Sequence, residues 1–198
     1  MSQLQAPRLY LASTSRYRAE LLSRLRLPFE TLDPGVDETA ADAEAPAALA
    51  LRLAQAKAQA NSLTQGIVIG SDQVAACQDR VLGKPGDSAA AHAQLRFCSG
   101  KTMTFYTGLA LWIPAQNRLL SETVPYQVTL RDLSSAEIDR YLAIDQPFDC
   151  AGSFKWEALG IALFEHMQGG DPTSLQGLPL IALCRHLRAQ GVLVPPQI

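Results

Sequence analysis

Short, wholly apolar segments that alternate with segments of helical periodicity constrain the fold of this chain most. Leu9–Ala12 and Gly66–Gly70 are uninterrupted apolar stretches of strand length, which is typical of strands buried in a sheet. Ser13-Thr14-Ser15 supplies capping residues before a helix expected over 16–25, and Pro46 opens a helix expected to end near Leu63. Strands that alternate with helices predict an α/β protein with a mixed central sheet flanked by helices.

The remainder of the chain continues this alternation. Asp33–Pro46 is acidic and rich in Ala and Pro, which indicates a loop. Ser134-Ser135-Ala136-Glu137 fits a capping box before a helix that ends near Ile144. The other expected elements are a helix from Ser88 to before Gly100, strands at Met103–Ile113, Glu122–Leu130 and Ile161–Phe164, and a last helix between Pro179 and Gly191.

Composition limits the partners of the chain. With 198 residues, 47% of them hydrophobic, and a net charge of −2, it has a globular composition, long enough for one large domain or two small lobes that share a sheet. No apolar run approaches the roughly 20 residues that span a bilayer, and Met1–Arg8 lacks the apolar region of a signal peptide. We therefore expect a cytoplasmic protein without a membrane partner. The near-neutral charge also argues against binding to nucleic acid.

Neither the cysteines nor the histidines form a pattern of metal ligands. The four cysteines contain no Cys-x-x-Cys pair, which favours buried, reduced thiols over a zinc site. The three histidines lack ligand spacing and are expected at the surface or at a rim. The chemistry must then come from Ser, Asp, Glu, Lys and Arg.

Arg18 breaks the pattern of the first helix. At about 100° per residue it lies within the apolar stripe formed by Leu21, Leu22 and Leu25. An arginine that faces inward needs an anion, and the helix N-terminus after Ser13 is itself an anion site. The alternative is an arginine whose charged end reaches out to water from the end of the stripe.

Lys57 and Asp72 are further polar residues in apolar surroundings. Lys57 lies on the face of Leu49 and Leu53, and Asp72 follows the apolar strand that ends at Gly70-Ser71, where α/β sheets carry ligands and catalytic carboxylates. A turn cap is the alternative for Asp72. With Arg18, Lys84 and the pair Asp37-Glu38, these residues match the needs of phosphoryl chemistry: cations for a polyphosphate and carboxylates for Mg²⁺ or Mn²⁺.

The same residues carry a resemblance to the Maf family of nucleoside triphosphate pyrophosphatases. The matching segments lie in the expected order from Leu9 to Leu187 and are Leu11–Ser15 with Arg18, Val36–Glu38, Leu53–Ala58, Ile69–Asp72, Gly83–Pro85 and Gly177–Pro179. The resemblance implies a single Maf-like domain over 1–198 and a Maf/ITPase-like α/β fold with two lobes around an active-site cleft. Members of the family are often homodimers, so a second copy of the chain is a candidate partner. The same resemblance implies a nucleoside triphosphate as substrate and a divalent metal as cofactor.

Within the family, the chain resembles the 7-methyl-GTP subgroup most. Gly70–Val74, Thr104–Leu111, Cys150–Lys155 and Leu178–Cys184 match that subgroup almost throughout. Gln73 stands where the dTTP/UTP branch typically has Thr, Glu157 where it has Gln, and Tyr17 where it has Arg. A carboxylate such as Glu157 can accept hydrogen bonds from the cationic 7-methylguanine edge, and Tyr17 can stack on it. Tyr17 replaces the usual Trp, and Trp156 replaces a commonly small residue.

The resemblance implies water attack on the α-phosphorus with Asp72 as general base and possible metal ligand. Arg18, Lys57 and Lys84 would stabilise phosphoryl charge, Ser13 would bind phosphate, and Asp37 and Glu38 would lie near the metal. Three alternatives stay open: a dTTP/UTP pyrophosphatase, a phosphatase with Asp72 as nucleophile, and a nucleotide-binding regulator without turnover. The phosphatase would need a second aspartate at the position of Val74.

Overall fold

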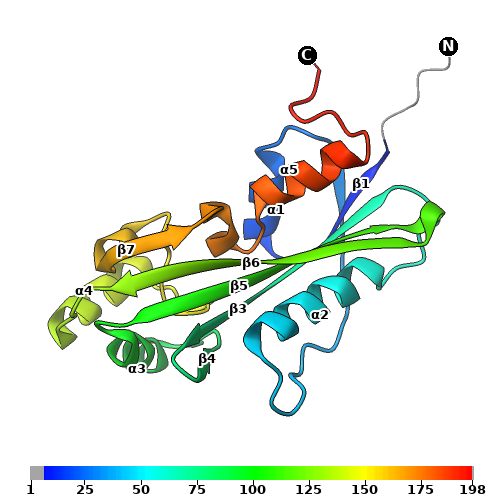
Figure 1. The fold of residues 1–198 in the computed structure, drawn as a ribbon. Helices are drawn as coiled ribbons and strands as arrows, with labels where there is room; N and C mark the ends of the chain where they lie inside the picture. The colour runs from blue at the N-terminus through cyan, green and yellow to red at the C-terminus, as the bar shows by residue number, and fades with distance from the viewer. Residues whose placement is uncertain (1–6, 198) are drawn as a thin grey trace. The chain divides into compact units, whose positions relative to one another are not determined.

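The structure is a computed structural model that describes residues 7–197. Residues 1–6 and 198 lie outside this range, and with them most of the polar stretch Met1–Arg8. Figure 1 shows the strands and helices of the chain. The elements are β1 (Leu9–Ala12), α1 (Arg16–Ser23), β2 (Phe29–Leu32), α2 (Pro46–Gln59), β3 (Ile67–Cys77), β4 (Arg80–Leu82), α3 (Ser88–Cys98), β5 (Thr102–Ile113), η1 (Pro114–Gln116), β6 (Arg118–Leu130), α4 (Ser135–Asp145), η2 (Leu159–Leu163), β7 (Phe164–Gly169), η3 (Pro172–Gln176) and α5 (Leu180–Ala189).

The sheet is mixed, as predicted. Its strand order is β2-β1-β3-β5-β6-β7, and β4 pairs with β3. β1 runs parallel to β2 and β3, whereas β3–β4 and β6–β7 are antiparallel pairs. The register pairs Ala12 with Gly70, so β1 ends while β3 continues to Cys77.

Asp72 therefore lies inside a strand, and its predicted place after the strand is wrong. β3 has 11 residues because its later part finds a second partner, with Ala75–Cys77 pairing with β4. Asp72 lies not at the carboxyl end of its own strand but near that of β1. Ser13 follows this end directly, and Asp72 lies two residues beyond Gly70, the partner of the last residue of β1.

The chain divides into two compact units. The first unit contains the stretch that ends at Gln73, Thr107–Val124 and the stretch that begins at Asp171. Its core joins α1, α5 and the strands through buried residues such as Leu21, Leu111 and Leu183. The second unit contains Val74–Tyr106 and Pro125–Gly170.

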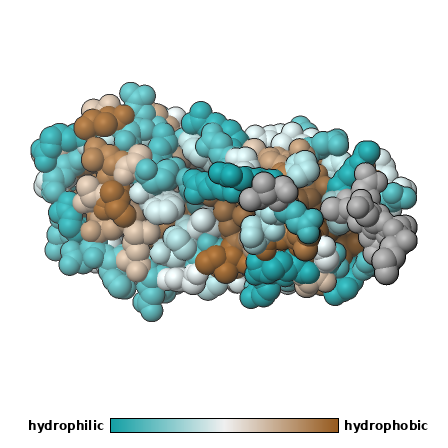
Figure 2. All heavy atoms as spheres, turned by 90° about the horizontal axis from the view of Figure 1, so that it is seen from above, coloured by the Kyte–Doolittle hydropathy of each residue, from teal (hydrophilic) through white to brown (hydrophobic). Residues whose placement is uncertain are grey.

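Aromatic rings form part of the core of the second unit. Phe154 meets both Phe105 and Phe164 edge to face, with ring centroids 5.4 and 4.8 Å apart. Not all hydrophobic side chains of this unit are enclosed, since Ile144 and Ile161 are exposed. Figure 2 shows hydrophobic side chains gathered at the end where α4 and β7 lie.

Two glycines let α2 lie directly on the sheet of the first unit. A Cβ at Gly70 would come within 2.2 Å of the Ala54 carbonyl oxygen, and one at Gly108 within 2.2 Å of the Ala50 carbonyl oxygen. No side chain fits at either position. This close packing brings the inner face of α2, which carries Lys57, next to β3.

Several element boundaries differ from the predictions. α1 ends at Ser23 and not near Leu25, and α2 ends at Gln59 because Asn61 donates to the Ala58 carbonyl and accepts from Leu63 N. The predicted strand Ile161–Phe164 is wrong: η2 occupies most of it and β7 begins at Phe164. The capping box of α4 is confirmed, whereas β2 and β4 were not anticipated.

The cysteines are free thiols, as the sequence analysis predicts. All four cysteines are free, with Cys77 and Cys98 buried and the other two half-buried. Burial raises the pKa of Cys98 to about 12, so its thiol stays protonated. Among the helices of residues 7–197, none has the length and apolar character needed to cross a membrane.

Candidate active site

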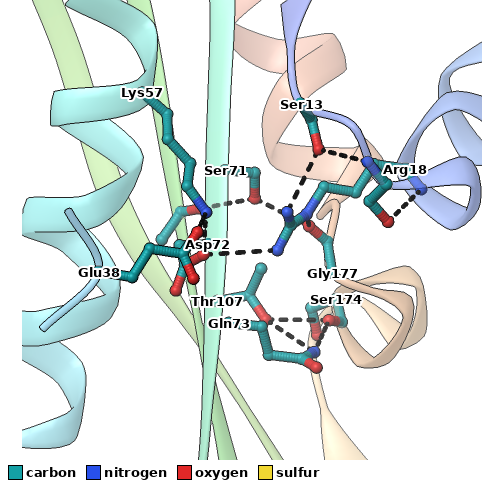
Figure 3. A network of polar contacts seen from close by, with 12 residues as sticks. Ser13, Arg18, Glu38, Lys57, Ser71, Asp72, Gln73, Thr107, Ser174 and Gly177 are labelled. Carbon is teal, nitrogen blue, oxygen red and sulfur yellow. Dashed lines mark hydrogen bonds and ion pairs between the residues drawn. The ribbon is translucent and has the colours of Figure 1, made fainter. Parts of the chain in front are cut away.

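Lys57 and Asp72 form a buried ion pair at the centre of a polar network in the first unit (Figure 3). The Lys57 Nζ lies 2.6 Å from Asp72 Oδ1, and the two residues are 5% and 7% exposed. The same ammonium lies 2.5 Å from Glu38 Oε1. A buried ammonium needs such partners because removal from water is costly for a charge. The inward orientation predicted for Lys57 from its helix face is confirmed.

Arg18 reaches the same carboxylate from the opposite side. Its Nη2 lies 3.7 Å from Asp72 Oδ1, its Nη1 donates to Ser13 Oγ at 3.3 Å, and its Nε donates to the Gly177 carbonyl at 2.9 Å. Burial lowers the pKa of Arg18, and the charges of Asp72 and Glu38 partly oppose this shift. The Arg18 side chain is 13% exposed, so the guanidinium is mostly buried and faces the network.

The N-terminus of α1 adds neutral donors to these two cations. Ser15 is the N-cap and accepts from Arg18 N, and Ser13 Oγ accepts from Ser15 N at 3.1 Å. Ser13 is only 5% exposed. A helix N-terminus, a serine hydroxyl, an ammonium and a guanidinium together form an environment suited to phosphate oxygens.

Gln73 belongs to a second polar group beside Asp72. Its Nε2 donates to the Ser174 carbonyl at 2.5 Å and to Thr107 Oγ1 at 3.3 Å, and Thr107 Oγ1 also donates to the Ser174 carbonyl. Because a carbonyl oxygen only accepts, the amide NH₂ of Gln73 must face Ser174. The Gln73 Oε1 is then the end of the side chain that can accept from a ligand.

The other predicted residues lie apart from this network or in the second unit. Asp37 is exposed and accepts from both the backbone N and Oγ1 of Thr39, which lowers its pKa. Tyr17 is half-buried on α1 with the Arg16 guanidinium over its ring. Lys84 and Glu157 are exposed residues of the second unit.

Four residues of the network were not anticipated: Ser71, Thr107, Ser174 and Gly177. Ser71 is fully buried, and its hydroxyl lies within 2.7 Å of the Gly108 carbonyl and 2.9 Å of the Gly177 carbonyl. The position of Ser71 inside an apolar strand could have indicated a buried polar contact from the sequence alone. Ser174 and Gly177 act through backbone carbonyls, which no side-chain pattern reveals.

Two carboxylates of the network could hold a metal ion only together with ligands from outside the chain. The described part of the chain contains no group of three or more His, Cys, Asp or Glu residues arranged for a metal ion. Glu38 and Asp72 provide two carboxylates that both contact the Lys57 ammonium. Mg²⁺ commonly takes one or two carboxylates together with substrate phosphates and water. Glu38 is better placed than Asp37, because Glu38 and Asp72 contact the same ammonium whereas Asp37 is held by Thr39.

Comparison with known proteins gives both a family and a fold. The family model described as "Maf-like protein" matches residues 8–190. The 7-methyl-GTP pyrophosphatase of Thiobacillus denitrificans is 52% identical over 189 residues, which cover 94% of each chain. That of Pseudomonas putida is 50% identical over 94% of this chain and 98% of its own. The solved structure of the Staphylococcus aureus Ham1 protein has a TM-score of 0.52 and 14% identity, with coverage of 92% and 99%, and supports the fold alone.

Proposed function

Because the chain belongs to the Maf family, we propose that it is a nucleoside triphosphate pyrophosphatase that hydrolyses 7-methyl-GTP to 7-methyl-GMP and pyrophosphate. The observation that supports this most is the convergence of Lys57 and Arg18 on Asp72 inside the first unit. Two relatives that are 52% and 50% identical to this chain are named 7-methyl-GTP pyrophosphatase.

The triphosphate binds to the cationic side of the network. Arg18 and Lys57 lie in a low-dielectric environment, where their attraction for phosphate oxygens is stronger than in water. The Ser13 hydroxyl can still donate its own hydrogen, and the N-terminus of α1 favours an anion. Lys84 contributes a further positive charge to the leaving pyrophosphate.

Asp72 acts on the attacking water. Its carboxylate accepts a proton as the water oxygen bonds to the α-phosphorus, and the bond from this phosphorus to the α,β-bridging oxygen breaks. Arg18 and Lys57 stabilise the negative charge that develops on the phosphoryl and leaving-group oxygens. The products are the nucleoside monophosphate and pyrophosphate.

A divalent cation completes the charge balance. Arg18 and Lys57 are already matched by Asp72 and Glu38, so the triphosphate brings excess negative charge. Mg²⁺ or Mn²⁺ held by Glu38 and Asp72 would neutralise part of that charge and polarise the phosphate oxygens.

Recognition of the base rests on Glu157, Gln73 and Tyr17. Methylation at N7 makes guanine cationic, and the Glu157 carboxylate accepts hydrogen bonds from its ring N–H and exocyclic amine. Gln73 offers its Oε1 because Ser174 holds its NH₂. Tyr17 presents an aromatic face to a cationic ring. A pyrimidine has neither this charge nor this donor edge.

A pyrophosphate-release assay tests the proposal directly. The purified chain is supplied with 7-methyl-GTP, GTP, dTTP or UTP, each with Mg²⁺, with Mn²⁺ or with a chelator. We expect metal-dependent pyrophosphate release with the highest kcat/KM for 7-methyl-GTP. Preference for dTTP or UTP would overturn the assignment of the base, orthophosphate as first product would indicate a phosphatase, and tight binding without turnover would indicate a regulator.

A further inference from the structure

We propose that Asp171 is a positioning residue for η3 and its C-cap, Gly177. It holds the Ser174 carbonyl against Gln73 and the Gly177 carbonyl against Arg18. The inference rests on the proposed function for its kinetic consequences, but its structural part stands on contacts within the first unit. Asp171 is a carboxylate only 3% exposed, at the N-cap of η3 and far along the chain from Arg18 and Gln73.

Asp171 connects η3 to α5. Its Oδ1 accepts from Thr173 N at 3.0 Å and Thr173 Oγ1 at 2.6 Å, while its Oδ2 accepts from Ile181 N at 2.7 Å. Thr173 Oγ1 in turn accepts from Leu180 N at 2.8 Å. The N-cap of α5 is Pro179, whose side chain cannot accept a hydrogen bond. Two free N–H groups of α5, those of Leu180 and Ile181, are therefore satisfied by Thr173 and Asp171. The negative charge lies at a helix N-terminus, where it is favourable.

The other side of η3 faces the network of the candidate site. The Ser174 carbonyl accepts from Gln73 and Thr107, and the Gly177 carbonyl accepts from Arg18 Nε and Ser71 Oγ. Figure 3 shows both carbonyl-bearing residues beside the side chains that they hold. One short segment thus fixes a phosphate-binding cation and a base-recognition amide together.

Gly177 makes this contact possible. Its φ of +89° belongs to the left-handed region, and a Cβ there would lie 3.1 Å from Arg18 Nε. The carbonyl and the guanidinium approach closely because no side chain intervenes. A shift of η3 would therefore move Arg18 and Gln73 relative to Asp72, and misplacement by about 1 Å can cost about a hundredfold in rate.

Asp171→Asn tests the proposal with little change in shape. Asp171 accepts hydrogen bonds through both carboxylate oxygens, whereas asparagine offers one oxygen and one NH₂. The NH₂ of the asparagine then faces an N–H or O–H donor of Thr173 or Ile181, so at least one hydrogen bond is lost. As a result, η3 is no longer held in a fixed position against α5. We expect kcat for 7-methyl-GTP to fall about tenfold to a hundredfold, with part of the preference over GTP lost.

A double-mutant cycle separates positioning from general destabilisation. If Asp171 acts through Arg18, Asp171→Asn will reduce kcat much less in an Arg18→Lys background than in the wild type. Glu137→Gln is the matched control, because Glu137 caps α4 in the second unit and touches none of these residues. We expect this control to lower Tm slightly without changing kcat. If the loss of kcat in the double variant equals the product of the losses in the two single variants, the two residues act independently and the proposal is overturned.

A readout without substrate keeps the test independent of the proposed function. The Arg18 Nε–H proton, donated to Gly177, should exchange with water slowly in NMR spectra of the wild type and at least about tenfold faster in Asp171→Asn. Unchanged exchange would overturn the proposal even in an inactive protein. Should Asp171→Asn not fold, Thr173→Val removes the acceptor of Leu180 N and is measured in the same way. Absence of turnover in the wild type would count against the proposed function alone.

Discussion

The charged residues predicted for the site differ in exposure between the two units. In the first unit, Arg18, Lys57 and Asp72 are largely buried and held by one another and by backbone carbonyls. In the second unit, Lys84 and Glu157 are exposed. Buried charges need fixed partners, whereas solvated charges do not. Substitutions at the first set should therefore change stability and turnover together, and substitutions at the second should change turnover or selectivity alone.

Asp72→Asn should have the largest effect on activity. Loss of the general base is expected to lower kcat by about a hundredfold to ten-thousandfold, and the neutral amide also leaves Lys57 and Arg18 without their shared carboxylate. Pyrophosphate release from 7-methyl-GTP measures the loss, and circular dichroism checks that the fold persists. Turnover near that of the wild type would remove Asp72 from its proposed role.

A matched pair of lysine substitutions tests the contrast between the units directly. Lys57→Met removes a cation that contacts both Asp72 and Glu38 in a buried place, and should lower the free energy of unfolding by about 3 kcal/mol. Lys84→Met removes an exposed cation and should leave that free energy unchanged within about 0.5 kcal/mol.

Urea titrations measure both stabilities, and pyrophosphate release measures turnover. Both variants should lose activity, Lys57→Met more than Lys84→Met. Equal losses of stability would show that the burial of Lys57 does not distinguish the two units.

The sequence predicted the buried part of the site well where helix periodicity applies. Arg18 and Lys57 occupy apolar helix faces. This geometry pointed Lys57 inward, whereas for Arg18 it left open an alternative in which the charged end reaches out to water. Asp72 was correctly grouped with them but misplaced relative to its strand, because the extension of β3 depends on pairing with β4. Pairing between strands is a tertiary property that a single segment does not encode.

The anchoring of the site was beyond local sequence signals. The contacts of Ser174 with Gln73 and of Gly177 with Arg18 join residues more than 100 positions apart, and they use backbone carbonyls that every residue carries. The sequence likewise left Asp37 and Glu38 equivalent. Their different partners, Thr39 for Asp37 and Lys57 for Glu38, follow from the loop conformation.

Glu157→Gln should separate selectivity from stability in the second unit. An amide accepts hydrogen bonds through one atom and carries no charge, so preference for the cationic base over GTP should fall about tenfold. Tm should stay within about 1 °C because Glu157 is exposed. Glu165→Gln, another exposed glutamate of this unit, is the control and should alter neither quantity. A selectivity equal to that of the wild type would exclude Glu157 from base recognition.

The smallest expected effect concerns a half-exposed charge cluster in the first unit. It tests whether burial, rather than the unit in which a charge lies, sets the loss of free energy of unfolding when that charge is removed. Glu122 on β6 contacts Arg185 and His186 on α5. Partial burial alone would raise the pKa of Glu122, but hydrogen bonds from Arg185 and His186 outweigh it and lower the pKa below 4.5. The folded state therefore holds this proton less tightly than the unfolded state. The resulting stability is present above about pH 4.5 and is lost as the pH falls through the lower folded pKa.

Urea unfolding of the wild type and Glu122→Gln at pH 7 and at several values below 4.5 measures this contribution. Solvent screening limits it to about 0.5–1 kcal/mol at pH 7, and the difference between the two proteins should shrink as the pH falls. Glu20→Gln removes an exposed charge from α1 and controls for the change in net charge. A loss of about 3 kcal/mol in Glu122→Gln would equal that expected for Lys57→Met, and the distinction between buried and half-exposed charges would then fail.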